Sequence, residues 1–139
     1  MRKTIVINGI SCEFKSSAAI PRMYRIKFNR DVFLDLSHLK KQLDAQNSEK
    51  EEAKLLAERS GKDFDASQYE SKLPVHTLEI FENIAHMMHK HGDPDQPRDT
   101  EEWLEQFEIF DIYEVLPQIL EMWDKENQQK SIPKKENEK

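Results

Sequence analysis

The sequence predicts an α+β, mainly α fold, with an N-terminal β-hairpin followed by about five helices packed as a small helical domain. Asn8-Gly9 is a strong signal for a two-residue hairpin turn, and apolar residues alternate with polar ones after it. From Ile20 onward, apolar residues recur at three- and four-residue spacing, which is typical of amphipathic helices. The two spacings together predict the fold class.

The length and composition favour one domain with a short tail. The chain has 139 residues, of which 37% are hydrophobic and 35% are charged, so we expect one economical core. We place the single domain at residues 1–128, with the hairpin at 1–15 and the helices at 16–128. Residues 129–139 are polar and rich in Lys and Glu, and we expect them to form a disordered polar tail.

The predicted hairpin joins strands at Thr4–Ile7 and Ile10–Lys15. In the second strand Ile10, Cys12 and Phe14 alternate with polar residues, so one face of this strand is apolar. We therefore expect Cys12 to be a small core residue rather than a nucleophile. A single cysteine excludes a disulfide within the chain.

Two amphipathic helices are predicted next. The first has Ser16 or Ser17 as its cap and ends at Asn29, which suits the left-handed position after a helix. It carries Ile20, Met23, Tyr24 and Phe28. The second is a short helix that opens at Asp35, with an apolar stripe of Leu36, Leu39 and Leu43.

A charged helix and a loop are predicted after these two helices. Ser48 and Glu51 form a capping box, which indicates the start of a helix. We expect this helix to reach Arg59 and to stop at Gly61. The segment Lys62–Lys72 is polar, and we predict a loop there.

The best-defined helix is predicted from Pro74 to Gly92. Its buried stripe is expected to consist of Val75, Leu78, Phe81, Ile84, Ala85 and Met88. The segment 93–97 contains two prolines and reads as a rigid connector. A further helix is predicted from about Asp99 to Phe110.

The last predicted helix opens with Asp111 and Glu114 as a capping pair and runs to about Asn127. Pro117 lies inside it. We expect this proline to kink or split the helix, because its ring clashes with the carbonyl four residues earlier.

The charge is unevenly distributed. The net charge is −6, but residues 1–41 hold nine Lys or Arg against three Asp or Glu, whereas residues 42–130 hold nine against twenty-two. Opposite charges of this kind favour head-to-tail self-association. We expect no nucleic-acid binding, since no DNA-reading motif is present and most of the chain would repel phosphates. The apolar runs are too short for a membrane span or a signal peptide, so a cytoplasmic protein is expected.

Catalytic and cofactor motifs are not found. The chain has three glycines, too few for a Gly-rich phosphate loop. His86, His89 and His91 lie close together, and a pair three residues apart can share a metal. We place His86 and His89 near the polar side of their helix, where cationic histidines favour its C-terminus. We expect no metal site, no cofactor and no enzyme activity.

The segment Asp99–Asp124 is both acidic and apolar. It contains nine carboxylates and thirteen large apolar side chains, with no Lys or Arg. One stripe consists of Ile112, Val115, Ile119 and Met122, and the other of Tyr113, Leu116, Leu120 and Trp123. The second stripe is either deeper core or a docking surface for another helix. The residues expected to bind a partner are Trp103, Phe107, Ile112, Val115, Ile119, Met122 and Trp123.

Four stretches of the chain resemble one known family. They are Thr4–Phe14 (TIVINGISCEF), Phe14–Leu36 (FKSSAAIPRMYRIKFNRDVFLDL), Glu108–Trp123 (EIFDIYEVLPQILEMW) and the ending Ser131–Lys135 (SIPKK). In order and overall pattern they are similar to tail assembly chaperones of long-tailed, siphovirus-like phages and prophages of Gram-positive bacteria. Asn29 stands where relatives often carry Gly, which is consistent with a left-handed helix cap.

The resemblance implies a non-enzymatic protein without cofactors. Such chaperones bind the tape measure protein, keep it soluble and promote polymerisation of the tail tube around it. The implied partners are the tape measure protein, the tail tube protein and a longer frameshifted form of the same chain. Lys134-Lys135 is compatible with the frameshift site. The implied location is the host bacterial cytoplasm, outside the mature virion.

Two other functions fit parts of the sequence. One is a small helical regulatory adaptor protein that binds an acidic partner or nucleic acid through its basic N-terminal part. The other is a metal-dependent enzyme that uses the histidines.

Overall fold

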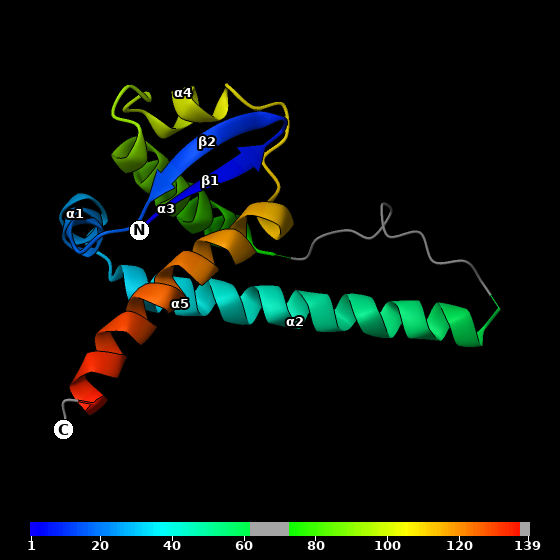
Figure 1. The fold of residues 1–139 in the computed structure, drawn as a ribbon. Coiled ribbons are helices and arrows are strands. Elements are labelled where there is room, and N and C mark those ends of the chain that lie inside the picture. The colour runs from blue at the N-terminus through cyan, green and yellow to red at the C-terminus, as the bar shows by residue number, and fades with distance from the viewer. Residues whose placement is uncertain (62–72, 137–139) are drawn as a thin grey trace.

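A hairpin and five helices make up the part of the chain that the structure, a computed structural model, describes. The description covers the backbone of residues 1–61 and 73–136 and the side chains through Asp124. The elements are β1 (Arg2–Ile7), β2 (Ile10–Lys15), α1 (Ala19–Phe28), α2 (Val32–Arg59), α3 (Val75–Gly92), α4 (Thr100–Leu104) and α5 (Ile112–Glu136). The predicted fold class is confirmed (Figure 1). The loop predicted at Lys62–Lys72 lies outside the described residues.

The hairpin has the predicted turn. β1 and β2 are antiparallel, with Ile7 opposite Ile10. Asn8 and Gly9 have φ angles of 53° and 81°, and a type I′ turn requires positive φ at both positions. The inner face of the hairpin is buried and consists of Ile5, Ile7, Cys12 and Phe14. Burial raises the pKa of the Cys12 thiol to about 11, so Cys12 is a neutral core residue as predicted.

α3 packs against the inner face of the hairpin and has the predicted extent, with Pro74 as the residue just before it. At its end, a Cβ atom on Gly92 would lie 2.3 Å from the carbonyl oxygen of Glu13. The close approach of α3 to β2 therefore requires glycine there. The predicted stripe needs one correction: the Val75 side chain is 74% exposed, because the helix begins beyond the edge of the core.

An ionic network joins α1 to α2. Asn29 has φ of 57° and ends α1 as predicted. Asp31, not Asp35, caps α2 by accepting hydrogen bonds from two backbone amides. Asp35 is buried and accepts from Tyr24 Oη at 2.6 Å and from Arg30 Nε at 2.7 Å and Nη2 at 2.8 Å. Burial opposes ionisation of Asp35, but these donors outweigh it and hold its pKa below the ordinary value.

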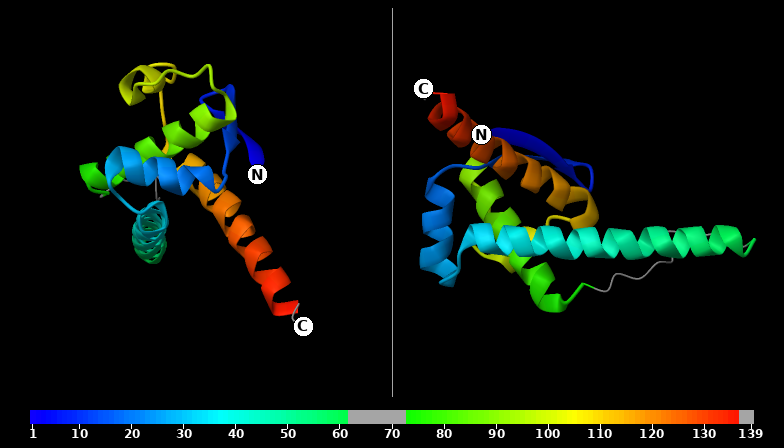
Figure 2. Two further views of the ribbon diagram at one scale, coloured as in Figure 1. Left: turned by 90° about the vertical axis from the view of Figure 1, so that its left-hand side faces the viewer. Right: turned by 90° about the horizontal axis from the view of Figure 1, so that it is seen from below.

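α2 is one long helix, so the two shorter helices predicted in this region are wrong. Ser48 and Glu51 lie within it and cap nothing. No Pro or Gly occurs between Val32 and Arg59, so nothing in the chain forces a break there. Its buried residues end at Gln46, and its distal half projects from the rest of the molecule (Figures 1 and 2).

α4 is much shorter than the helix predicted from Asp99 to Phe110. Asp99 caps it by accepting from the Glu102 amide. After Leu104 the chain leaves the helix, and the rings of Phe107 and Phe110 turn back onto Trp103, with centroids 5.3 and 5.2 Å away. The chain packs around Trp103 by turning after Leu104, and the helix does not continue.

α5 opens as predicted, with Asp111 Oδ1 accepting from the Tyr113 amide at 2.9 Å. Pro117 does not split it, because α5 runs from Ile112 to Glu136 as one helix. The proline has no N–H to donate to the Tyr113 carbonyl, and that hydrogen bond is missing. The helix continues to Glu136, past the expected end near Asn127 and into the segment predicted as a disordered tail. Residues 137–139 lie outside the described residues.

Candidate functional site

All seven residues expected to bind a partner lie in the hydrophobic core. Trp103, Phe107, Ile112, Val115, Ile119, Met122 and Trp123 each have an exposed fraction of 8% or less. They belong to one cluster with the buried residues of the hairpin and α3. In this structure the seven side chains form no exposed docking surface, and the alternative of deeper core applies to them.

The position of α5 explains why it carries two apolar stripes. It contacts β1, α2 and α3, so side chains on more than one side of it are covered. Trp123 shows this arrangement, because its Nε1 donates to Met88 Sδ on α3 at 3.4 Å while its ring meets Phe33 of α2 edge-on at 5.6 Å. Tyr113 and Leu120 of the second stripe are partly buried against the same core.

His86 and His89 are buried, each 3% exposed, so their predicted place on the polar side of α3 is wrong. The connector after Gly92 and α4 cover this side of the helix. His86 Nε2 lies 2.6 Å from the Pro97 carbonyl oxygen and its Nδ1 3.0 Å from Thr100 Oγ1. His89 Nδ1 accepts from Trp103 Nε1 at 2.8 Å. The histidines thus hold α4 and its connector against α3.

Burial favours the neutral form of both imidazoles, and for His89 a hydrogen bond requires it. A carbonyl can only accept, so His86 Nε2 carries its proton, whereas His89 Nδ1 accepts and must be unprotonated. Burial lowers the pKa of both residues. In the described part of the chain, no three His, Cys, Asp or Glu side chains are grouped so that they could hold a metal ion.

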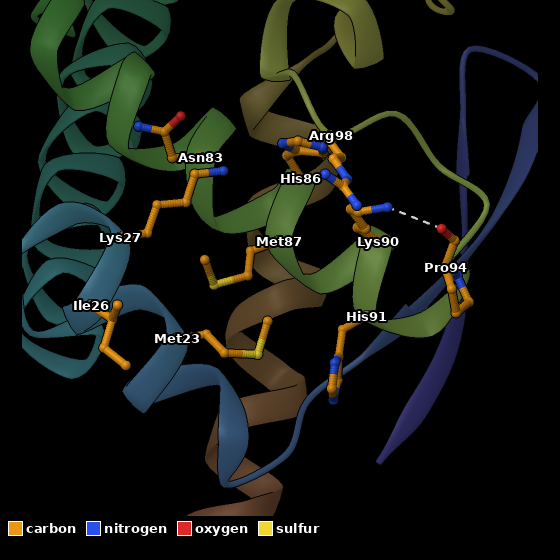
Figure 3. A pocket seen from close by; sticks show the side chains of 10 residues that line it. All are labelled: Met23, Ile26, Lys27, Asn83, His86, Met87, Lys90, His91, Pro94 and Arg98. Carbon is orange, nitrogen blue, oxygen red and sulfur yellow. Dashed lines mark hydrogen bonds between the residues drawn. The ribbon is translucent and has the colours of Figure 1, made fainter.

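An open groove lies between α1 and α3 and is the candidate functional site. Its volume is about 590 Å³. Met23, Ile26 and Lys27 come from α1, and the 93–99 connector supplies Pro94 and Arg98. The remaining lining residues belong to α3: Asn83, His86, Met87, Lys90 and His91. Figure 3 shows Met23 and Met87 side by side between the two helices.

The groove has an apolar floor and a basic rim. His86 and Met87 are buried at its base, whereas Met23 is 40% and Ile26 71% exposed. His91 Nε2 lies 3.0 Å from Ser17 Oγ, which ties the end of the groove to the segment before α1. Methionine side chains are flexible and polarisable and adapt to varied apolar partners. The groove is therefore suited to binding apolar side chains.

The sequence carried only a partial signal for this groove. The sequence prediction groups Met23 with Ile20, Tyr24 and Phe28. Met23 and Ile26 lie three residues apart, on a side of α1 distinct from the buried Ile20 and Tyr24. Met87 was outside the predicted stripe of α3. Neither observation shows that α1 and α3 would lie side by side, which is a consequence of the tertiary fold.

The fold and the groove define a small, mainly helical α+β domain with an open apolar hollow on one side. Comparisons with models of protein families, with curated proteins and with solved structures found no match for this chain. Within the described residues, no helix is both long and apolar enough to cross a membrane.

Proposed function

We propose that this chain is a phage tail assembly chaperone that binds the tape measure protein in the host bacterial cytoplasm. It keeps that protein soluble, promotes polymerisation of the tail tube around it, and is not part of the mature virion. The observation that carries the proposal is the open, methionine-lined groove between α1 and α3. The resemblance of Thr4–Phe14, Phe14–Leu36 and Glu108–Trp123 to such chaperones supports it.

A groove of this kind suits a helical client. An amphipathic helix binds by placing apolar side chains three, four and seven residues apart into a hydrophobic groove. The tape measure protein of the resembled family is long and helical, so several copies of a chaperone can line up along it. Many weak contacts on one client then add up to tight overall binding, and each copy can still leave when the tube closes around the client.

Co-expression tests the proposal directly. The tape measure protein is produced alone, with the wild-type chain, and with Ile26→Asp or Val75→Asp, and its soluble fraction is measured after centrifugation. We expect the wild type and Val75→Asp to raise the soluble fraction and Ile26→Asp to fail. Val75 is a matched control because it is as exposed as Ile26 but does not line the groove. An unchanged soluble fraction with the wild type would overturn the proposal.

A second candidate function is a small regulatory adaptor that binds an acidic partner or nucleic acid. The basic rim of the groove favours it, since Lys27, Lys90 and Arg98 lie together there. Binding to a duplex DNA oligonucleotide would support this function over the chaperone. This binding should be lost when the salt concentration is raised and in Lys27→Glu.

A further inference from the structure

The charges lining the groove between α1 and α3 have one sign. Its lining includes the cations Lys27, Lys90 and Arg98 but no Asp or Glu. The chain as a whole has 27 acidic residues against 21 basic ones. A lining with three cations and no carboxylate is complementary to a partner that carries negative charge beside its apolar surface.

The rim cations are available to a partner. None of Lys27, Lys90 and Arg98 forms an ion pair with a carboxylate of the described residues. Lys90 Nζ donates to the carbonyls of Pro94 at 3.0 Å and Gln96 at 2.7 Å, which fixes its ammonium group at the rim without neutralising it.

Two acidic side chains of the connector before α4 form local hydrogen bonds. Asp93 accepts from the Gln96 side chain at 3.0 Å, and Asp99 caps α4 through the Glu102 amide at 3.1 Å. Burial lowers the pKa of His86 at the base of the groove; Lys27 and Lys90 add to this shift, whereas the Pro97 carbonyl and Asp99 oppose it. Both rim lysines therefore act electrostatically on the base of the groove.

We propose that the groove binds a helical segment whose apolar stripe is flanked by carboxylates. This inference rests on the proposed function and names the part of the client that is bound. The apolar stripe contacts Met23, Ile26 and Met87, and the flanking Asp or Glu side chains meet Lys27, Lys90 and Arg98. A helix fits better than an extended peptide, because two helices and a connector line the groove and no strand edge is available there for main-chain pairing.

Two designed peptides test the charge preference with the full-length chain. Both are fluorescent helical peptides with the same leucine stripe, flanked by Glu in one and by Lys in the other. We expect the Glu-flanked peptide to bind about tenfold more tightly at low salt, with the difference shrinking at about 0.5 M salt because the rim is exposed. Equal binding of the two peptides at low salt would overturn the proposal.

Variants locate the binding to the groove. Lys27→Glu combined with Arg98→Glu should reduce or reverse the preference for the Glu-flanked peptide, whereas Lys41→Glu should leave it unchanged. Lys41 is a matched control because it is exposed on α2 and does not line the groove. Circular dichroism establishes that each variant is folded. A preference that survives in the folded double variant would place the site elsewhere and overturn the proposal.

The same variants separate this inference from the chaperone function. If the wild type and the folded double variant both keep the tape measure protein soluble, the chaperone function stands and the groove inference is wrong. If the peptide preference holds but the wild type does not solubilise the tape measure protein, the groove inference stands and the proposed client is wrong. Displacement of the Glu-flanked peptide by a duplex DNA oligonucleotide at equal concentration would make the groove a nucleic-acid site and overturn the inference.

Discussion

Apolar side chains of the C-terminal segment Asp99–Asp124 are more buried than the sequence indicates, and those of helix α1 are more exposed. The C-terminal segment has thirteen large apolar side chains, a density that favoured a docking surface, yet its partner-binding candidates are buried. α1 has six apolar residues among ten and three basic ones, and it leaves Met23 and Ile26 exposed beside a groove. Two regions of similar apolar content thus differ in exposure, so the neighbouring elements, and not the number of apolar residues, decide which side chains are covered.

The difference follows from the position of each helix in the fold. α5 crosses α2 and also contacts β1 and α3 (Figure 2), and a helix covered on several sides needs apolar residues on several sides. α1 lies at the edge of the molecule, where α2 and α3 cover it. Its remaining apolar side chains therefore face solvent beside the groove.

The largest expected effect is in the buried segment. Trp103→Ala should lower the free energy of unfolding by about 3–5 kcal/mol, because Trp103 is fully buried and its Nε1 donates to His89. Denaturant unfolding followed by circular dichroism measures this. Ile109→Ala in the same segment is the control, since Ile109 is 65% exposed and its loss should change stability by less than about 0.5 kcal/mol. Similar effects of the two changes would contradict the assignment of this segment to the core.

Gly92→Ala should have the next largest effect. The added Cβ would meet the Glu13 backbone at 2.3 Å, and forcing α3 away from β2 should cost about 1–3 kcal/mol. Gly61→Ala is the comparison, because open space surrounds Gly61 and its φ is +73°, so only the backbone strain of about 1 kcal/mol is expected. A smaller loss for Gly92→Ala than for Gly61→Ala would show that the hairpin can shift to accept a side chain.

The pH dependence of stability tests the neutral histidines. The pKa of His86 and His89 lies below the ordinary value of 6.5, so the unfolded chain takes up protons first as the pH falls. Their contribution to stability is present above 6.5 and is lost progressively below it. The melting temperature should therefore fall between about pH 7 and pH 5.

His89→Gln keeps a hydrogen-bond acceptor for Trp103 Nε1. In this variant the melting temperature should fall less steeply as the pH is lowered. His76→Gln should leave its slope unchanged, because His76 is exposed. A decline that keeps the same slope in His89→Gln would exclude His89 as its cause.

A substitution in the groove should have the smallest effect on stability. Ile26→Asp should change the free energy of unfolding by less than about 0.5 kcal/mol, because the side chain is mostly exposed. In the buried segment, Ile119→Asp should unfold the protein. Thermal melting distinguishes the two, and a large destabilisation by Ile26→Asp would mean that α1 is held by the groove residues themselves.

Local signals predicted the local structure well. Asn8-Gly9 and Asn29 predicted positive φ where it occurs, and the spacing from Pro74 to Gly92 predicted α3. The capping box at Ser48 and Glu51 misled, because the same residue types are acceptable on an exposed helix interior. These successes and this error all concern interactions between residues close in the sequence.

The burial of His86 and His89 could not be predicted from α3 alone. Their partners lie in the connector and α4, in Pro97, Thr100 and Trp103, and only the fold brings these segments over the helix. The groove depends in the same way on the packing of α1 against α3. Contacts between distant segments decide which apolar side chains are covered, and a single sequence contains no direct measure of them.

The projecting half of α2 makes the molecule mechanically asymmetric. α2 has 28 residues and is about 42 Å long, while its buried residues lie only between Val32 and Gln46. A rotation of about 10° at Gln46 would move the Arg59 end by about 3 Å, since about 20 Å of helix extends beyond that point. The Asp35 network ties the base of this lever to α1, one wall of the groove. Any tilt of α2 as a rigid helix about this base is therefore largest at its Arg59 end.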